Sequence, residues 1–380
     1  MRQIITINPV SLINRRDNPD KIADTQVLVR ENWMVIGIGD NKKVRKVPGS
    51  SRHNATAAAS SPFVRGIRYY TTKSVRKTYA FNQGNGSLYH VSDNGALTQL
   101  ISTFGVTAYP AFEIMRVSSN DILYFSEGIN TGMYSYDGNL DNTFIKESAV
   151  TLNFVGMLGF LDRMWGFEDN TDTIYFSTNL VPTDFTNATT AGSIQVGAKR
   201  GSKIQAILLM NETLYIFKQD SIWVLEGRTP NEFTVREVIS DLGVAARGSV
   251  VSVEGGCGFL GSDFEFYSWN GSGSRPKLMS HLIALGGDLT VNLREIINKD
   301  RMEQITATYH NRIYRMAFAE TGLTRNQLEY CFDFTNDTDF ITRGNDVSCY
   351  IRYDRYPDKN ELLTGRSDVG RLMLQYKGLN

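Results

Sequence analysis

Residues 201–240 read GSKIQAILLMNETLYIFKQDSIWVLEGRTPNEFTVREVIS, and their pattern decides the fold. Polar turns separate four apolar runs: 203–210, 213–219, 221–227 and 233–239. Each run has the length of a strand, and most carry β-branched or aromatic residues at alternate places. Two-residue connections only permit antiparallel neighbours, so the stretch predicts a four-stranded meander. One such sheet cannot bury both of its faces, and it therefore needs copies of itself or a second sheet.

The third run of this unit recurs along the chain as an apolar and aromatic run. Its seven copies are anchored by Tyr89, Tyr134, Tyr175, Trp223, Tyr267, Tyr330 and Met373. Subtracting the residue numbers gives intervals of 45, 41, 48, 44, 63 and 43 residues. All but one match the roughly 40–50 residues of a propeller blade. A generic β-sandwich gives no reason for a four-strand repeat over seven cycles. The sequence therefore predicts an all-β propeller of six or seven four-stranded antiparallel blades; residues 26–83 can be divided in more than one way.

The long interval and the two ends of the chain suggest how the propeller is organised. Residues 270–304 read as an insertion between blades, with one short helix near 292–303 and Asn292 as its N-cap. We assign 1–30 to an N-terminal arm and 31–380 to the propeller. The last cycle supplies only three strands, and an unpaired edge invites aggregation. We therefore expect an N-terminal strand, from the runs at 1–7, 25–32 or 33–39, to complete the last blade; the arm can alternatively reach a neighbouring subunit.

The composition excludes several classes of protein. Forty basic and forty acidic residues give a net charge of zero, which argues against a dedicated nucleic-acid binder. The basic cluster at 41–49 is interpreted as a solvated strand and turn. Three scattered cysteines do not make a disulfide framework, so reduced thiols are expected. Residues 1–9 lack the apolar core of a secretory signal, and the apolar stretch 149–161 is too short to span a membrane.

A search for reactive groups predicts no catalytic, metal or cofactor residue. The four histidines, at 53, 90, 281 and 310, lack the spacing of metal ligands. Residues 136–142 approach a calcium loop without its glycine and glutamate, and we interpret them as a hairpin turn. The glycine-rich tract 254–263 lacks the Lys-Ser/Thr of a phosphate loop and is interpreted as a tight turn between strands. Cys257, within this tract, has no adjacent histidine that could activate it.

Three stretches resemble one group of known proteins: GSIQVGAKRGSKIQAILLMNETLYIFKQDSIWVLEG (192–227), FTVREVISDLGVAARGSVVSVEGGCGFLGSDFEFYSWNG (233–271) and VLVRENWMVIGIGDNKKVRKVPG (27–49). They are similar to β-propeller structural proteins of tailed-bacteriophage tails and necks, of the nozzle or tail-hub type. The likeness extends over most of residues 27–377, and its motifs are structural. Relatives often end the third stretch with Arg-Pro-Gly, whereas this chain has Val47-Pro48-Gly49.

The resemblance implies a non-enzymatic virion component that is made in the host cytoplasm. Such a protein forms a ring of identical subunits, hexameric by resemblance, and joins the portal to the tail. Its partners would be an adaptor, fibres or a needle, and genomic DNA would pass during ejection without tight binding. The channel of one propeller is too narrow for duplex DNA, so the passage is expected between subunits.

Two other functions stay open from the sequence. A receptor- or carbohydrate-binding propeller would use exposed aromatic side chains such as Trp269 and Tyr356. A glycan-cleaving enzyme ranks last, because no acid pair was found. Strand alternation also makes a prediction for 221–227, in which Ile222 and Val224 face one side and Trp223 and Leu225 the other. Trp223 is therefore expected to be largely buried between sheets.

Overall fold

The computed structural model describes residues 33–375 with gaps. The described part omits 37–42, 47–49, 54–63, 72–75, 83–85, 94, 106–109, 130–131, 138–143, 199–200, 273–274, 280–282, 285–289, 355–359 and 368–370. The arm assigned to 1–30 therefore lies outside the described residues. Within them, no helix is both long and apolar enough to cross a bilayer.

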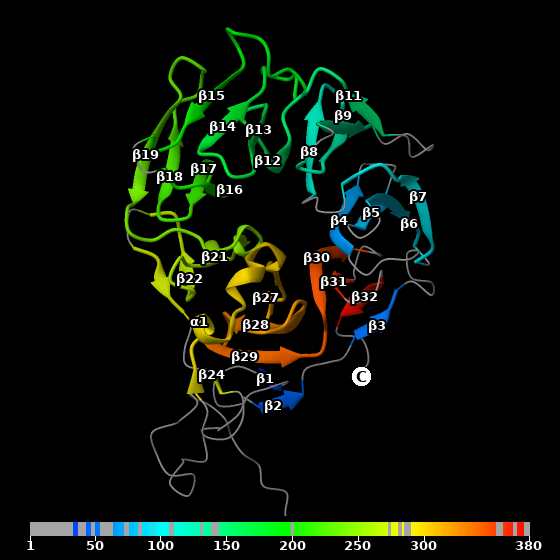
Figure 1. Ribbon diagram of the computed structural model, residues 1–380, viewed down its shortest axis with the longest axis vertical. Coiled ribbons are helices and arrows are strands. Elements are labelled where there is room, and N and C mark those ends of the chain that lie inside the picture. Colours follow the sequence, from blue (N-terminus) through cyan, green and yellow to red (C-terminus); the bar gives the residue numbers. More distant parts are fainter. Residues whose placement is uncertain are drawn as a thin grey trace, which may run out of the picture.

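Seven four-stranded antiparallel sheets form a closed ring, which confirms the propeller and fixes the blade count at seven (Figure 1). Blade 1 contains β4 (Val64–Thr71), β5 (Arg76–Asn82), β6 (Ser87–Val91) and β7 (Leu97–Ile101). Blade 2 contains β8 (Ala111–Val117), β9 (Asn120–Ser126), β10 (Met133–Tyr136) and β11 (Ile145–Glu147). Blade 3 contains β12 (Phe154–Phe160), β13 (Arg163–Glu168), β14 (Thr173–Phe176) and β15 (Gly192–Gln195).

The next three blades continue in chain order. Blade 4, the meander read first from the sequence, contains β16 (Ile204–Met210), β17 (Thr213–Lys218), β18 (Ile222–Glu226) and β19 (Thr234–Ile239). Blade 5 contains β20 (Val251–Val253), β21 (Gly256–Leu260), β22 (Phe266–Trp269) and β23 (Lys277–Leu278), and the short 3₁₀ turn η4 (Arg247–Ser249) precedes it. Blade 6 contains β26 (Thr306–His310), β27 (Ile313–Ala319), β28 (Asn326–Asp333) and β29 (Thr338–Arg343). All seven anchor residues lie on the third strand of their blades, counted outward from the centre of the ring.

Blade 7 joins the two ends of the chain. It contains β30 (Val347–Asp354), β31 (Asn360–Arg366), β32 (Leu372–Gln375) and, as its outermost strand, β3 (Ser50–Arg52). The β3 residues pair antiparallel with β32, and the backbone N–H of His53 donates to the Leu372 carbonyl at 2.9 Å. The expected closure by an N-terminal strand is therefore present. The strand is 50–52, however, and not one of the three runs named from the sequence.

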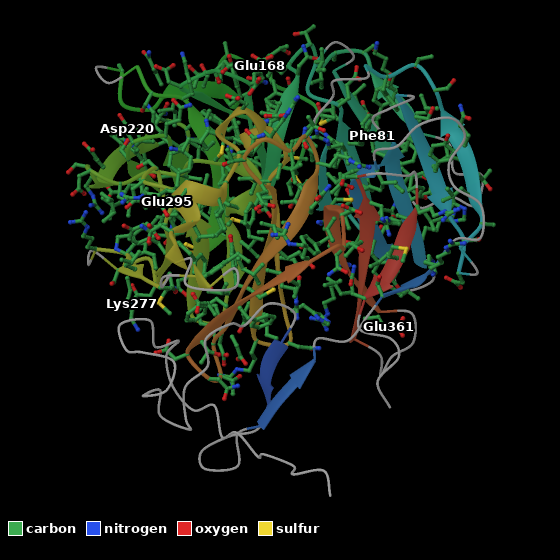
Figure 2. The ribbon with its side chains drawn as sticks, turned by 60° about the horizontal axis from the view of Figure 1, so that its bottom comes forward. Phe81, Glu168, Asp220, Lys277, Glu295 and Glu361 are labelled. Carbon is green, nitrogen blue, oxygen red and sulfur yellow. The ribbon has the colours of Figure 1, made fainter. Side chains whose placement is uncertain are left out.

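The last of those runs has another partner. Residues 33–36 form β1 (Trp33–Ile36), which pairs with β2 (Lys43–Lys46) in a separate two-stranded sheet. The basic cluster thus contributes a strand, as interpreted. Figures 1 and 2 both show this hairpin outside the ring, and β1 contacts β29 of blade 6. A segment that folds back on its chain neighbour is not available to complete blade 7.

The insertion after blade 5 is less helical than expected. After β23 the chain forms the short pair β24 (Ile283–Ala284) and β25 (Thr290–Val291), then α1 (Leu293–Ile296) and the 3₁₀ segment η5 (Lys299–Gln304). The Asn292 cap was right, since its side chain and that of Glu295 form a capping box. A continuous helix over 292–303 was wrong, because Ile297 is extended and instead bridges to Glu320 of blade 6. Tertiary pairing here prevails over helical periodicity.

The hydrophobic core is divided into layers between neighbouring blades. Aromatic and aliphatic side chains fill these layers. In the layer between blades 1 and 2, Phe81 (labelled in Figure 2) lies against Phe125, with the ring centroids 5.8 Å apart. The faces of β18 are as predicted: Ile222 and Val224 pack toward blade 5, and Trp223 and Leu225 toward blade 3. Trp223 packs into the layer between blades 3 and 4 as expected, and its side chain retains some exposure. β18 lies away from the axis, where radiating blades diverge.

Candidate functional site

The first strand of each blade lines the centre of the ring. The seven first strands, β4, β8, β12, β16, β20, β26 and β30, contact one another in sequence around the axis. Figure 1 shows β4, β8, β12, β16 and β30 facing the central channel. Residues at the start of these strands are therefore brought together from seven distant parts of the chain.

A β-bulge recurs at the start of four of these strands. The register with the second strand skips one residue in β4, β12, β16 and β30. The skipped residues are Arg65, Val155, Gln205 and Ser348, each the second residue of its strand. A bulge redirects the side chain of the extra residue. All four side chains line one cavity at the mouth of the channel.

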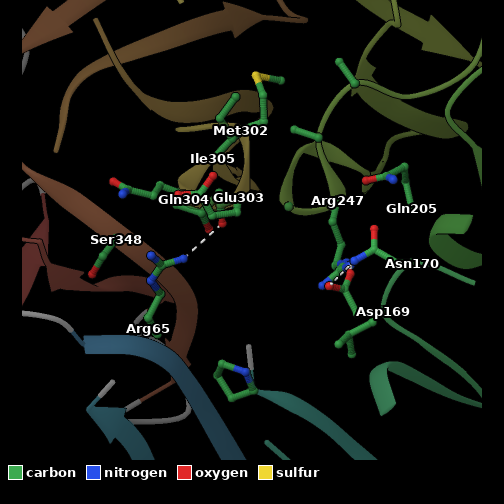
Figure 3. Close-up of a pocket in the computed structure, with 16 residues that line it drawn as sticks. Arg65, Asp169, Asn170, Gln205, Arg247, Met302, Glu303, Gln304, Ile305 and Ser348 are labelled. Atoms are coloured by element: carbon green, nitrogen blue, oxygen red, sulfur yellow. Dashed lines mark hydrogen bonds and ion pairs between the residues drawn. The ribbon is translucent and has the colours of Figure 1, made fainter. Parts of the chain in front are cut away.

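This cavity, the mouth pocket, has a volume of about 410 Å³ and takes residues from all seven blades or the links that lead into them (Figure 3). Its lining combines charged, amide, hydroxyl and aliphatic side chains: Arg65, Pro110, Val155, Asp169, Asn170, Gln205, Ala245, Ala246, Arg247, Gly248, Met302, Glu303, Gln304, Ile305, Thr306 and Ser348. Such a volume is within the usual range of ligand pockets, about 300–1,000 Å³.

Two contacts cross the mouth and skip a blade each (Figure 3). Arg247, in the link before blade 5, forms an ion pair with Asp169, in the β13–β14 turn of blade 3, at 2.5 Å. Arg65 of blade 1 donates from Nη1 to the backbone carbonyl of Glu303, before blade 6, at 3.0 Å. Side chains therefore link non-adjacent blades on two sides of the channel mouth.

The link 242–249 holds Arg247 in place through close backbone packing. A Cβ on Gly248 would lie 2.0 Å from the Ile305 carbonyl oxygen, so only glycine allows this approach to blade 6. Ser249 donates to the Ala246 carbonyl and accepts from the backbone N–H of Leu260. Tyr314 of blade 6 donates to the Ser249 carbonyl at 2.8 Å. The guanidinium of Arg247 lies over the Phe167 ring, 5.8 Å from its centroid.

Deeper in the channel, a second polar chain joins blades 1, 2 and 3. Glu113 on β8 lies 3.9 Å from Arg68 on β4 and accepts from the backbone N–H of Gly159 on β12 at 3.0 Å. Burial raises the pKa of the Glu113 carboxyl, and the charge of Arg68 and the Gly159 N–H only partly oppose this.

The residues considered for chemistry from the sequence are dispersed. His53 and His310 are buried in blades 7 and 6, and burial, followed by the charge of Lys77, lowers the pKa of His90 in blade 1. His281 lies outside the described residues, as do 138–142 of the calcium-like loop. Burial raises the pKa of the Cys257 thiol to about 12. Across the described part of the chain, no cluster of three or more His, Cys, Asp or Glu residues could hold a metal ion.

The aromatic residues proposed as sugar-binding handles are not confirmed. Trp269 is only 2% exposed; it packs edge-on against Tyr215 between blades 4 and 5, and its Nε1 donates to the Ser272 carbonyl. The prediction that Trp269 is an exposed sugar-binding residue was wrong, because its side chain packs against the neighbouring blade. Tyr356 lies outside the described residues. The glycine-rich tract forms the β20–β21 hairpin with Gly255 at φ +76°, as interpreted.

Sequence reasoning missed the mouth pocket. Arg65, Asp169 and Arg247 were not singled out, because they lie far apart in the chain and share no motif. The one usable signal was the stretch GVAARGS (243–249), which the phage resemblance quoted only as a structural link.

Comparison with known proteins supports the fold alone. No protein-family model and no curated protein matches the chain. Among solved structures, it is similar to the extracellular domain of a one-component system from B. thetaiotaomicron, with TM-score 0.56, 13% identity and coverage of 86% of this chain. The chain spans 40% of the length of that protein. BBS1N, solved in complex with ARL6DN, has TM-score 0.53 and 9% identity, covering 93% of this chain and 99% of the other. At these identities the likeness shows the propeller fold alone.

Proposed function

We propose that the chain is a non-enzymatic structural component of a tailed-phage tail or neck, of the nozzle or hub type. Several copies would form a ring that connects tail parts and surrounds the DNA passage. The proposal rests on the resemblance of three stretches of the sequence, and the fold is compatible with it. A propeller is a rigid disc with a broad rim and many loops for contacts with neighbours.

The observation that carries the structural part of this proposal is the bridged channel mouth. Contacts of 2.5 and 3.0 Å skip blades 4 and 7 and narrow the mouth from opposite sides (Figure 3). We expect the channel of a single propeller to be too narrow for duplex DNA. A ring of such discs would leave the passage along the axis of the oligomer, outside each propeller.

Elements outside the blades give such a ring a place for contacts. The β1–β2 hairpin and the β24–β25 pair both lie outside the ring, in Figure 1 on the side of blade 6. A two-stranded hairpin is marginally stable by itself and gains from packing against another surface. This side of the disc is where we would place the contact with a neighbouring copy or tail protein.

Two measurements test the proposed function. Mass spectrometry and immunogold labelling of purified particles of the encoding phage should find the chain in the tail or neck, in a copy number that matches ring symmetry. Abundant chain in infected cells with none in particles would contradict the proposal. Incubation with a panel of bacterial surface polysaccharides tests the alternatives: binding without cleavage would favour a recognition module, and released sugar would favour an enzyme.

A further inference from the structure

The side chains that line the mouth pocket can bind a ligand as well as link the blades to one another. Figure 3 shows Arg65 and Arg247 on opposite sides of the pocket, each reaching inward. Three amide side chains also line the pocket, those of Asn170, Gln205 and Gln304. The buried Oε1 of Gln304 has no hydrogen-bond partner among the described residues. A buried acceptor without a donor is unfavourable.

A ligand carboxylate can replace that of Asp169 on Arg247 at a small cost in free energy. The side chain of Asp169 is 46% exposed, so the carboxylate half of the ion pair is open to solvent, whereas Arg247 is 24% exposed. Exposed pairs of this kind contribute little free energy. The Phe167 ring and the packed link 242–249 hold Arg247 independently of Asp169. A carboxylate that enters the pocket can therefore replace Asp169 on a guanidinium that is already positioned.

We propose that the mouth pocket binds the carboxylate end of a peptide chain. The terminal carboxylate would replace Asp169 on Arg247, since a planar guanidinium pairs with a carboxylate through two parallel hydrogen bonds. Gln205 and Gln304 would bind the peptide groups, because an amide side chain both donates and accepts. The charges of two arginines are balanced by those of Asp169 and Glu303 in the lining, which disfavours a polyanion as the ligand. This inference does not depend on the phage assignment.

The test uses the full-length chain and three defined probes in titration calorimetry. The probes are N-acetyl-trialanine with a free C-terminus, the same peptide with a C-terminal amide, and glutarate. We expect the free acid to bind at least about tenfold more tightly than the amide and than glutarate, a difference of about 1.4 kcal/mol. Arg247→Gln should weaken binding of the free acid by a similar factor.

The reverse substitution gives the sharper result. Asp169→Asn removes the internal competitor and should tighten binding of the free acid by about two- to fivefold. A merely structural role for the ion pair would not produce opposite effects from its two partners. Arg236→Gln is the matched control, because Arg236 pairs with Glu226 at 2.6 Å on the outer strands of blade 4 and should leave binding unchanged.

Four results would overturn the inference. These are equal binding of acid and amide, binding of glutarate as tight as that of the peptide, no binding at millimolar peptide, and weaker binding by Asp169→Asn. Circular dichroism establishes that each variant is folded. If Arg247→Gln does not fold, the Asp169→Asn variant still tests the inference, because it retains the guanidinium of Arg247.

Discussion

At the scale of single residues, Trp165 and Trp223 are buried to different extents in the layer between blades 3 and 4. Trp165 is fully buried against Phe176 and Phe233, and its Nε1 donates to the Phe160 carbonyl at 3.0 Å. Trp165→Ala should lower the free energy of unfolding by about 3–5 kcal/mol. Trp223→Ala should cost clearly less, because Trp223 is only partly buried. Urea denaturation of both variants checks the order, and equal losses would contradict it.

A second residue-scale prediction concerns pH and Glu113. Because its pKa is raised in the folded protein, the protonated form favours folding. Its contribution to stability is full below the ordinary value of 4.5 and is lost as pH rises through the raised folded-state pKa. Glu113→Gln mimics the protonated group and keeps an acceptor for the Gly159 N–H. The variant should be more stable than the wild type at neutral pH, and the difference should shrink on acidification; denaturation midpoints between pH 3 and pH 8 measure it. A difference that does not change with pH would refute the account.

The residues that line the mouth pocket could not be predicted from the sequence. Strand periodicity places a residue on one of two faces, but a bulge changes that assignment by one position. Arg65 and Gln205 sit on bulges that no residue type announces, so their direction could not be derived. Asp169 and Arg247 meet only because blades 3 and 5 converge on the axis. Their pairing is a property of the closed ring.

At the scale of elements, the turn between the first and second strands of blade 4 can be made more stable by substitution. Asn211 and Glu212 form a two-residue turn with φ of +49° and +58°, and Met210 pairs with Thr213. Asn-Gly is the preferred sequence for such a turn, and a non-glycine residue at positive φ is strained. Glu212→Gly should therefore raise the free energy of unfolding by about 0.5–1 kcal/mol, after the entropy of glycine in the unfolded chain is subtracted.

The control for this turn is a glycine placed in a strand. Lys146 is exposed in the middle of β11, and Lys146→Gly should lower stability by about 0.5–1 kcal/mol. Chemical denaturation of both variants then gives opposite signs for the same type of substitution. If both destabilise the protein equally, backbone strain at Glu212 is not released by glycine.

Ring closure gives the second prediction at this scale. Deleting residues 1–49 retains β3, whereas deleting 1–53 removes it and exposes the backbone edge of β32. The shorter chain should melt at a markedly lower temperature and aggregate, because an open blade edge pairs with other chains. Calorimetry and light scattering of the two truncations compare them directly. Matching melting temperatures and solubility would show that β3 is dispensable.

At the scale of the whole molecule, the propeller architecture was easier to predict from the sequence than the strand that completes blade 7. The 40–50-residue interval survives in the sequence because each third strand supplies a side chain to an inter-blade layer, as Tyr134 and Tyr330 do. β3 carries no such signal. It is three polar residues, Ser-Ser-Arg, at the outermost position of blade 7, where backbone pairing with β32 defines the strand. Apolar patterning therefore predicts the longer runs upstream, and this prediction is wrong.

The route of DNA is the remaining question at this scale, and it rests on the proposed function. Arg247 and Asp169, replaced by cysteines, can be joined across the mouth with a flexible bismaleimide. The native thiols should not compete, since burial raises the pKa of Cys257, Cys331 and Cys349 to about 12 each. If DNA passes between copies of the disc, phage particles with the stapled protein should eject their genomes at the unstapled rate. The control is the same double variant capped with N-ethylmaleimide, which carries the substitutions without the bridge. Ejection that stops on stapling and resumes when a cleavable linker is cut would place the passage inside the propeller, and the contacts across the mouth would then have to open to admit the DNA.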